Sequence, residues 1–272
     1  MDVAWSADEE PVVGVVDRGR DAGDAVQIDD SLESTLTDAT IVRGSRNEVL
    51  AAGSSVLVIA GEEGVSAAAR AGVETPVLPV GSITGIESVD RDRVSDALRE
   101  VLDGHAIRRT RPVLSVTRTA GPKTERGTES DDGSGCERAL FDVTLVTDEP
   151  ARISEYGVHS RGSSVATFRA DGVVAATPAG SHGYASDIDA PQLSTAIDAL
   201  TVAPIGPFIT QTRRWVLPED DLALTIEREE GDVTLVVDGH AVGAVSVDSR
   251  VTVAATGTLP TLVVPDEGHE ER

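Results

Sequence analysis

Hydrophobic and polar positions alternate regularly along the first hundred residues of the chain. Three short apolar runs have the length of buried strands: residues 11–16, 54–61 and 75–82. Three amphipathic stretches follow them in turn, each with helical spacing and a glycine at its end: residues 45–53, 62–72 and 90–104. Because strands that alternate with helices form parallel sheets, this part predicts an α/β domain.

The pattern changes after residue 108. The polar segment 117–139 predicts a surface loop or hairpin excursion between two strands. Beyond it the chain reads as short strands broken by Gly and Asp turns, interrupted only at 191–204. We therefore expect an α/β N-terminal domain over 1–108 and a mostly-β C-terminal domain over 109–264. We expect the tail, 265–272, to fray or to return to the first domain.

Composition and charge narrow the class of protein. Hydrophobic residues make up 40% of the chain and aromatic residues only 3%, which predicts an aliphatic core. The chain has 47 acidic and 23 basic residues, a net charge of −24, and its acids are spread along its whole length. Such a field repels nucleic acid and anionic membranes, so neither is an expected partner. With Lys123 as the single lysine, this composition is typical of a salt-adapted protein, because molar salt shortens the Debye length to about 3 Å.

Cysteine usage and the absence of apolar spans point to the cytoplasm. Cys136 is the only cysteine, which excludes an intrachain disulfide and leaves a Cys-based zinc site without ligands. The N-terminal stretch has no basic region followed by a long apolar core, so we expect no secretory signal. No segment approaches the roughly 20 apolar residues of a membrane helix. We expect a cytoplasmic protein, and we assign no residue as a metal ligand.

Two acidic positions are candidates for chemistry. The stretch 61–65, GEEGV, joins a predicted parallel strand to a helix, where backbone N–H groups can face an anion. Glu62 and Glu63 fit a catalytic role there, but they also fit first-turn acids that the helix dipole favours. Asp142, inside an apolar strand, fits either a site residue or an acid on the wet face of a strand.

The third candidate is DGVVAATPAGSHGYASD, residues 171–187. An apolar strand here meets two hydroxyls, two glycines and one aromatic ring within a few residues. Glycines allow close approach of the backbone to a ligand, and Tyr184 offers a face on which a ring can stack. This combination exceeds what a turn requires, so it favours a binding loop.

These three stretches resemble, in order and spacing, motifs of the NAD kinase family, whose members phosphorylate the 2′-hydroxyl of the adenosine ribose of NAD. The family has Gly-Gly-Asp-Gly-Thr, Ala-Leu-Asn-Glu/Asp and Gly-Asp-Gly…Thr-Pro-Thr-Gly-Ser-Thr-Ala-Tyr, where this chain has AGEEGV, ALFDV and ADGVVAATPAGSHGY. Three later segments, 203–208, 216–220 and 237–240, resemble further family motifs. The similarity is diffuse over 11–110 and specific over 137–265.

The resemblance implies roles for individual residues. Glu63 falls on the catalytic Asp, the general base, and Gly61 and Gly64 on the glycines beside it, with ATP or polyphosphate as donor and Mg²⁺ or another divalent cation. The residues implied in NAD binding are Asp142, Arg152, Arg169, Asp171, Thr177, Gly180, Ser181, His182, Gly183, Tyr184, Ser186 and His240. The family also implies a homodimer or homotetramer.

Departures from the family motifs leave alternatives open. Glu62 replaces a glycine, Val65 a threonine and Phe141 an asparagine, so the donor half of the site is less well matched than the NAD half. The first expectation is a kinase that makes NADP and so serves NADP biosynthesis. The alternative is a catalytically impaired paralogue that binds the dinucleotide as a sensor or regulatory protein. A lipid kinase of the same superfamily matches the binding loop less well.

Overall fold

The computed structural model describes residues 10–16, 39–119, 136–149, 152–209, 212–247 and 249–265. The chain forms two compact units. The first contains the residues up to Arg111 and those from Thr258 onward, and the second spans Pro112–Gly257. The expected division ended the first domain at residue 108 and placed residues 109–264 in the second. The units differ from it because the last strand runs from the second unit into the first. The tail beyond residue 265 lies outside the described residues.

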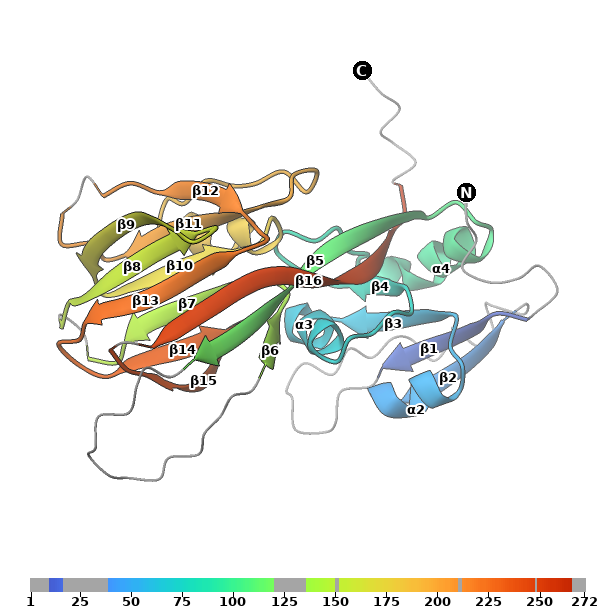
Figure 1. Cartoon of the computed structure of the whole chain (residues 1–272). Helices are drawn as coiled ribbons and strands as arrows, with labels where there is room; N and C mark the ends of the chain where they lie inside the picture. The colour runs from blue at the N-terminus through green and yellow to red at the C-terminus, as the bar shows by residue number, and fades with distance from the viewer. Residues whose placement is uncertain are drawn as a thin grey trace, which may run out of the picture. The chain divides into compact units, whose positions relative to one another are not determined.

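The first unit is built on a parallel sheet with the strand order β2-β1-β3-β4-β16 (Figure 1). Its strands are β1 (Val12–Val16), β2 (Thr40–Gly44), β3 (Val56–Ala60), β4 (Val77–Val80) and the end of β16 (Arg250–Val263). Its helices are α2 (Arg46–Ala51), α3 (Glu62–Arg70), the 3₁₀ turn η1 (Arg91–Arg93) and α4 (Val94–Leu102). The three predicted strands and three predicted helices are thus present. Strand β2 was not predicted, because this edge strand is only partly buried and has no continuous apolar run.

Alternate side chains of the central strands form the core of this unit. Val13, Val15, Val56 and Val58 are each at most 1% exposed and pack in one cluster with the apolar stripe of α4. The other face of β3 points its leucine and isoleucine side chains away from α4, as the period of two in a strand requires. Every residue of β4 is buried, as expected for a strand with neighbours on both sides.

The second unit consists mainly of two antiparallel sheets. One has the order β12-β11-β10-β7-β14-β15, and the other contains β16, β13, β8 and β9, with β5 beside β16 and β6 beside β5. The strands are β5 (Ile107–Thr119), β6 (Cys136–Ala139), β7 (Asp142–Thr147), β8 (Ser154–Ser160), β9 (Ser163–Ala170), β10 (Gly172–Ala176), β11 (Ala199–Ile205), β12 (Trp215–Pro218), β13 (Leu222–Arg228), β14 (Val233–Val237) and β15 (His240–Val245). In the described part of this unit, two short helical turns interrupt the strands, η2 (Gly180–His182) and α5 (Tyr184–Asp187).

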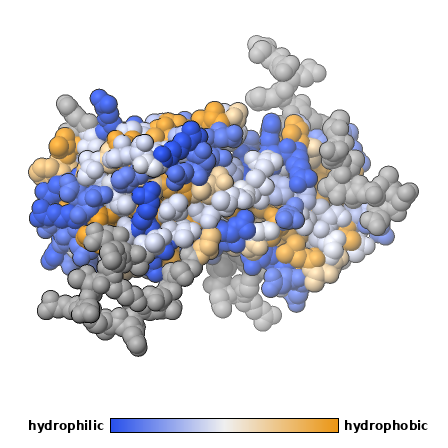
Figure 2. Space-filling model, viewed as in Figure 1, coloured by the Kyte–Doolittle hydropathy of each residue, from blue (hydrophilic) through white to orange (hydrophobic). Residues whose placement is uncertain are grey.

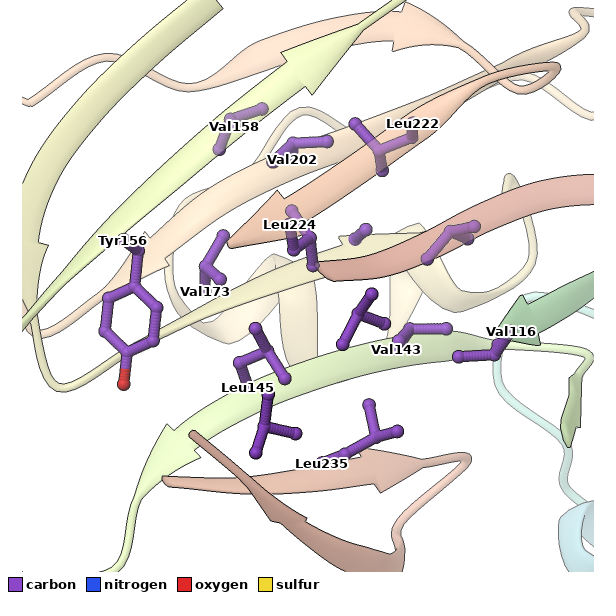
Figure 3. Close-up of a cluster of buried hydrophobic side chains, with 14 of the residues drawn as sticks. Val116, Val143, Leu145, Tyr156, Val158, Val173, Val202, Leu222, Leu224 and Leu235 are labelled. Carbon is purple, nitrogen blue, oxygen red and sulfur yellow. The ribbon is translucent and has the colours of Figure 1, made fainter. Parts of the chain in front are cut away.

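Aliphatic side chains from both sheets fill the core of the second unit. Figure 3 shows Val143, Leu145 and Val173 pointing toward Leu222 and Leu224 of the facing strands. Among the described residues, Tyr156 is the one large aromatic side chain that is fully buried, and its hydroxyl lies 2.9 Å from the hydroxyl of Thr147. An aliphatic core was predicted from the composition, and the predicted fold class is confirmed by both units.

Three local expectations for the second unit are corrected by the structure. The expected strand 139–148 is broken between β6 and β7, at Leu140 and Phe141. The segment 191–204, expected to interrupt the strands, ends in β11, which is buried between β10 and β12. Strand β8 was not predicted, because glycine and polar residues alternate with its buried side chains.

Hydrophilic residues are spread across the visible surface of both units, and hydrophobic residues appear between them singly or in small groups (Figure 2). Among the residues that the structure describes, no helix is both long and apolar enough to cross a membrane.

Candidate functional site

The stretch Gly61–Gly64 lies at the carboxyl end of β3. Gly61 has φ +73°, a left-handed conformation that glycine adopts without strain, and it turns the chain from the strand into α3. The chain places β2 on one side of β1 and β3 on the other, so the strand order reverses between β1 and β3. In open α/β sheets, ligands bind at the carboxyl ends of the strands beside such a reversal. The topology therefore makes this turn a candidate ligand site.

The first turn of α3 offers both donors and carboxylates. Gly61 has no side chain, so it cannot cap the first backbone N–H groups of α3. Glu62 and Glu63 are both exposed in this turn, where the helix dipole favours negative charge. The turn thus combines N–H groups that suit a phosphate with carboxylates that can accept a proton.

No preformed metal cage accompanies these acids. Within the described parts of the chain, no group of three or more His, Cys, Asp or Glu side chains is placed to hold a metal ion. Mg²⁺ at phosphate-transfer sites is usually held by one or two carboxylates together with substrate phosphates and water. Glu62 and Glu63 supply carboxylates of that kind, so the residues present fit a divalent cation that arrives with a phosphate ligand.

In the second unit, the loop after β10 is seated against Leu140 and Phe141. The Thr177 amide donates to the Phe141 carbonyl at 2.9 Å, and the Thr177 hydroxyl donates to the Leu140 carbonyl at 2.7 Å. The same hydroxyl accepts from the Gly180 amide at 3.1 Å. A Cβ at Gly180 would lie 2.1 Å from the Phe141 carbonyl oxygen, so only glycine fits here. Gly180 is required by this close backbone approach.

The hydroxyls of this loop have internal partners. The Ser181 hydroxyl donates to the Pro178 carbonyl at 2.7 Å and accepts from the Leu193 amide at 2.8 Å. Thr177 and Ser181 are both 0% exposed, and their hydroxyls stabilise the conformation of the loop. Their predicted contact with NAD stays a prediction.

The remaining predicted residues of the loop lie at its outer side. His182 Nε2 is 3.2 Å from the Leu193 carbonyl, and the Ser186 hydroxyl accepts from Gln192 at 2.9 Å. Gly183 lies between η2 and α5, and its amide donates to the Gly180 carbonyl at 3.1 Å. These contacts hold the short α5, and with it Tyr184, in place.

Three carboxylates influence Tyr184 electrostatically. Tyr184 is 45% exposed. Partial burial raises the pKa of its hydroxyl, and the negative charges of Asp142, Asp171 and Asp187 raise it further. Tyr184 is therefore within electrostatic range of both Asp142, at the start of β7, and Asp171, which precedes the other end of β10.

The carboxylate of Asp171 is held in an unusual way. Its Oδ1 atom is buried and has no hydrogen-bond partner among the described residues. If Gly206 had a Cβ, that atom would lie 2.3 Å from the Oδ2 atom of Asp171. Gly206 also has φ +53°. Glycine at 206 therefore makes room for this acid, which lies within electrostatic range of Tyr184.

Sequence reasoning missed Asp238 as a site residue. Its Oδ2 accepts from the Leu140 amide at 2.9 Å, and its Oδ1 accepts from the Phe141 and Asp142 amides at 2.8 and 3.1 Å. Three amides on one carboxylate break the expected long strand and position Asp142 at the start of β7. The motif VDGH contained this signal, but only His240, whose Nδ1 lies 2.9 Å from the Asp238 carbonyl, was selected from it.

We expect Asp238→Asn to destabilise the protein and weaken ligand binding. Asparagine tolerates the φ of +46° at this position, so the change removes the charge and one acceptor without adding backbone strain. Hydrogen bonds to charged groups contribute about 1.5–3 kcal/mol each, so a loss of roughly 2 kcal/mol in unfolding free energy is expected. Urea unfolding measures it, with Asp232→Asn, an exposed acid before β14, as the control. Equal stability of the two variants would contradict this role.

The two arginines predicted to bind NAD, Arg152 and Arg169, are placed differently in the structure. Arg152 pairs with Glu149 at 2.5 Å and donates to the Glu230 carbonyl at 3.3 Å, before β14 begins. Asp238 follows the other end of β14, which at strand geometry is roughly 17 Å away. Arg169 is exposed and lies over the Phe208 ring, 5.8 Å from its centre. Arg152 is therefore not brought together with Asp142 by the structure.

Comparisons with known proteins match both the sequence and the fold. Residues 140–264 match the model of the ATP-NAD kinase C-terminal domain. The NAD kinase of Methanosarcina mazei is 32% identical over 110 residues, which cover 40% of this chain and 38% of that protein. The chain thus spans less than half of the length of this curated relative.

Two solved structures share the fold over nearly the whole chain. Yeast NADH kinase, solved in complex with NADH, has a TM-score of 0.77 and 15% identity, over 96% of this chain and 85% of that one. An NAD kinase from Archaeoglobus fulgidus, solved in complex with ATP, has a TM-score of 0.67 and 16% identity, over 94% of both chains. At these identities the likeness shows a common fold.

Proposed function

We propose that the protein phosphorylates NAD to NADP, because residues 140–264 match the model of the ATP-NAD kinase C-terminal domain. The observation that carries the proposal is the turn at the carboxyl end of β3. There the helix N–H groups of α3 and the carboxylate of Glu63 lie together beside the reversal of strand order. This arrangement provides a phosphate cradle and a proton acceptor, the two groups that phosphoryl transfer to a hydroxyl requires.

In the proposed reaction, a Glu63 carboxylate oxygen accepts the proton of the ribose 2′-hydroxyl. The 2′-oxygen forms a bond to the terminal phosphorus of the donor, and the bond from that phosphorus to its bridging oxygen breaks. With ATP, ADP leaves with the electron pair of the broken bond, and Glu63 then releases its proton to water. Most of the rate in such reactions comes from positioning and charge stabilisation.

The donor phosphates would be held by Gly61, Gly64 and the first N–H groups of α3. A divalent cation, for which Glu62 and Glu63 offer carboxylates, would neutralise charge on the phosphates when bound. The complex of the Archaeoglobus fulgidus NAD kinase with ATP supports ATP as the donor, and polyphosphate is the alternative to test.

The dinucleotide would be held by the loop after β10 and the start of β7. The partly exposed ring of Tyr184 offers a stacking face, and Asp142 and Asp171 offer acceptors for ribose hydroxyls or the adenine amino group. Arg169, His182, Gly183, Ser186 and His240 stay predicted contacts. Thr177, Gly180 and Ser181 would act by giving the loop its shape.

We expect Tyr184→Ala to weaken NAD binding by about 1–3 kcal/mol, the value typical of losing one stacked base. Tyr184→Phe is the matched control, because it keeps the ring and removes only the hydroxyl. Calorimetric titration of NAD into both variants measures the effect. Stacking predicts a large loss for alanine and a small one for phenylalanine. Wild-type affinity in Tyr184→Ala would remove this ring from the site.

The function is tested by NADP formation with purified protein, Mg²⁺ and each pairing of ATP or polyphosphate with NAD or NADH. The assay is run at low and at molar KCl, because the net charge of −24 leads us to propose salt adaptation. NADP or NADPH formation supports the kinase. Dinucleotide binding without turnover in any condition would instead favour the sensor. Sedimentation of the same samples tests the proposed homodimer or homotetramer.

A further inference from the structure

The carboxyl edge of the parallel sheet brings a basic residue beside the proposed phosphate turn. The Gly61 amide donates to the Val80 carbonyl at 2.9 Å, so the turn after β3 lies directly beside the end of β4. Gly81 follows Val80, and its amide donates to the Val89 carbonyl at 2.8 Å. Gly61 and Gly81 therefore leave neighbouring strands, roughly 5 Å apart at the usual spacing.

Arg91 extends to this point from the segment after Val89. Its Nε atom lies 3.7 Å from the position that a Cβ of Gly81 would occupy. Arg91 is exposed, and among the described residues its guanidinium has no hydrogen-bond or ion-pair partner. Gly81 has φ +89° and no side chain, so nothing from that residue separates the guanidinium from the strand end.

Two sets of contacts fix the segment that carries Arg91. Ser88 donates from its hydroxyl to the Gly81 carbonyl at 2.5 Å, which closes the loop between them. Glu87 is bound by the guanidinium of Arg111, which is 2% exposed and also donates to Thr261 at 3.3 Å. Partial burial raises the pKa of the Glu87 carboxyl, but hydrogen bonding and the Arg111 charge outweigh this and leave the pKa below its usual value. The loop is thus held in one arrangement.

The negative charge at the turn favours a basic residue beside it. Glu62 and Glu63 place two negative charges where an anionic donor would bind, and they repel it unless cations compensate. Other arginines of this unit are engaged elsewhere: Arg46 donates to the Ala67 carbonyl, and Arg70 lies in the last turn of α3, away from its N-terminus. Arg91 is the described arginine with an unengaged guanidinium at the strand end beside Gly61.

We propose that Arg91 binds the terminal phosphates of the donor and holds them at the turn Gly61–Gly64. This inference rests on the proposed function and adds a donor-binding residue to it. Arginine suits this task because its planar guanidinium forms two parallel hydrogen bonds with phosphate oxygens. NAD binding, assigned to the second unit, does not involve it.

The test compares Arg91→Gln, Arg91→Lys and Arg99→Gln by calorimetric titration of Mg²⁺–ATP and of NAD, and by steady-state kinetics. Arg99→Gln is the matched control, since it removes one exposed positive charge of α4 that, among the described residues, pairs with Asp96 three residues before it. Arg91→Gln should weaken Mg²⁺–ATP binding and raise the KM for ATP by at least tenfold, and leave NAD affinity unchanged. Arg91→Lys should recover part of the loss. Measurements in molar KCl retain a direct contact but screen a long-range charge effect.

The outcomes distinguish failure of the Arg91 assignment from failure of the proposed function. If wild-type protein binds Mg²⁺–ATP without turnover and Arg91→Gln loses that binding, the proposed function fails and the assignment of Arg91 stands. If Arg91→Gln binds ATP as wild type does, or loses no more than Arg99→Gln, the assignment is overturned whether or not NADP forms. Failure of the wild type to bind Mg²⁺–ATP also overturns it.

Discussion

Glu63→Gln is expected to lower kcat for NADP formation by about 10²–10⁴-fold, the contribution typical of a general base. Glutamine keeps the length and shape of the side chain but cannot accept the proton of the 2′-hydroxyl at neutral pH. The residue lies in the first turn of α3 and is exposed there, so the change should not disturb the core. Steady-state kinetics with NAD and ATP measures the loss. NAD affinity by calorimetry should stay at the wild-type value.

The neighbouring acid supplies the control for this result. Glu62→Gln removes the same charge from the same turn of α3 and leaves Glu63 in place. A general electrostatic effect would change both variants alike, whereas base catalysis requires a much larger loss in Glu63→Gln. Equal losses in the two variants, or full activity of Glu63→Gln, would contradict the assignment of Glu63.

Gly180→Ala is expected to destabilise the second unit and abolish tight NAD binding. The new Cβ would lie 2.1 Å from the carbonyl oxygen and 2.5 Å from the carbonyl carbon of Phe141, both backbone atoms. Since the backbone must move to admit it, a loss of about 1–3 kcal/mol in unfolding free energy is expected, as for other overpacked sites. The displaced loop should also shift Tyr184. Thermal unfolding and NAD titration measure the two effects.

Gly231→Ala is the control for this steric argument. A Cβ there lies 3.2 Å from Cδ of Arg152, a flexible side chain that can give way. This variant should lose little stability and no NAD affinity. If Gly180→Ala is as stable as Gly231→Ala and binds NAD equally well, the loop is not seated against Phe141 in the way that we describe.

Local sequence patterns predicted the elements whose burial is regular. The parallel sheet was predictable because β3 and β4 are continuous apolar runs, and α4 because its apolar stripe has helical spacing. Edge strand β2 has no such pattern and was missed. The break before β7 was also missed, because it is caused by Asp238, a residue 96 positions after Asp142. An interaction at that sequence separation leaves no signal in the pattern of residues 139–148 itself.

Residue type singled out the loop after β10 as a candidate binding loop but did not indicate the direction of its side chains. Thr177 and Ser181 appeared as hydroxyls available to a ligand, and the fold buries both against backbone carbonyls. Arg91 belongs to no motif, and only the hydrogen bonds that place β4 beside β3 connect it with Gly61. The sequence could therefore indicate where chemistry is located, whereas the tasks of individual side chains depended on contacts between distant segments.

The most direct test of the proposed reaction follows the terminal phosphate itself. Purified protein is incubated with Mg²⁺ and ATP labelled in its terminal phosphate, together with either NAD or an NAD analogue that lacks the adenosine 2′-hydroxyl. Our account predicts that label enters NAD, that the product is NADP by its reaction with an NADP-specific dehydrogenase, and that the analogue takes up no label. Label found only in free phosphate, or equally in the analogue, would contradict phosphoryl transfer to the 2′-hydroxyl.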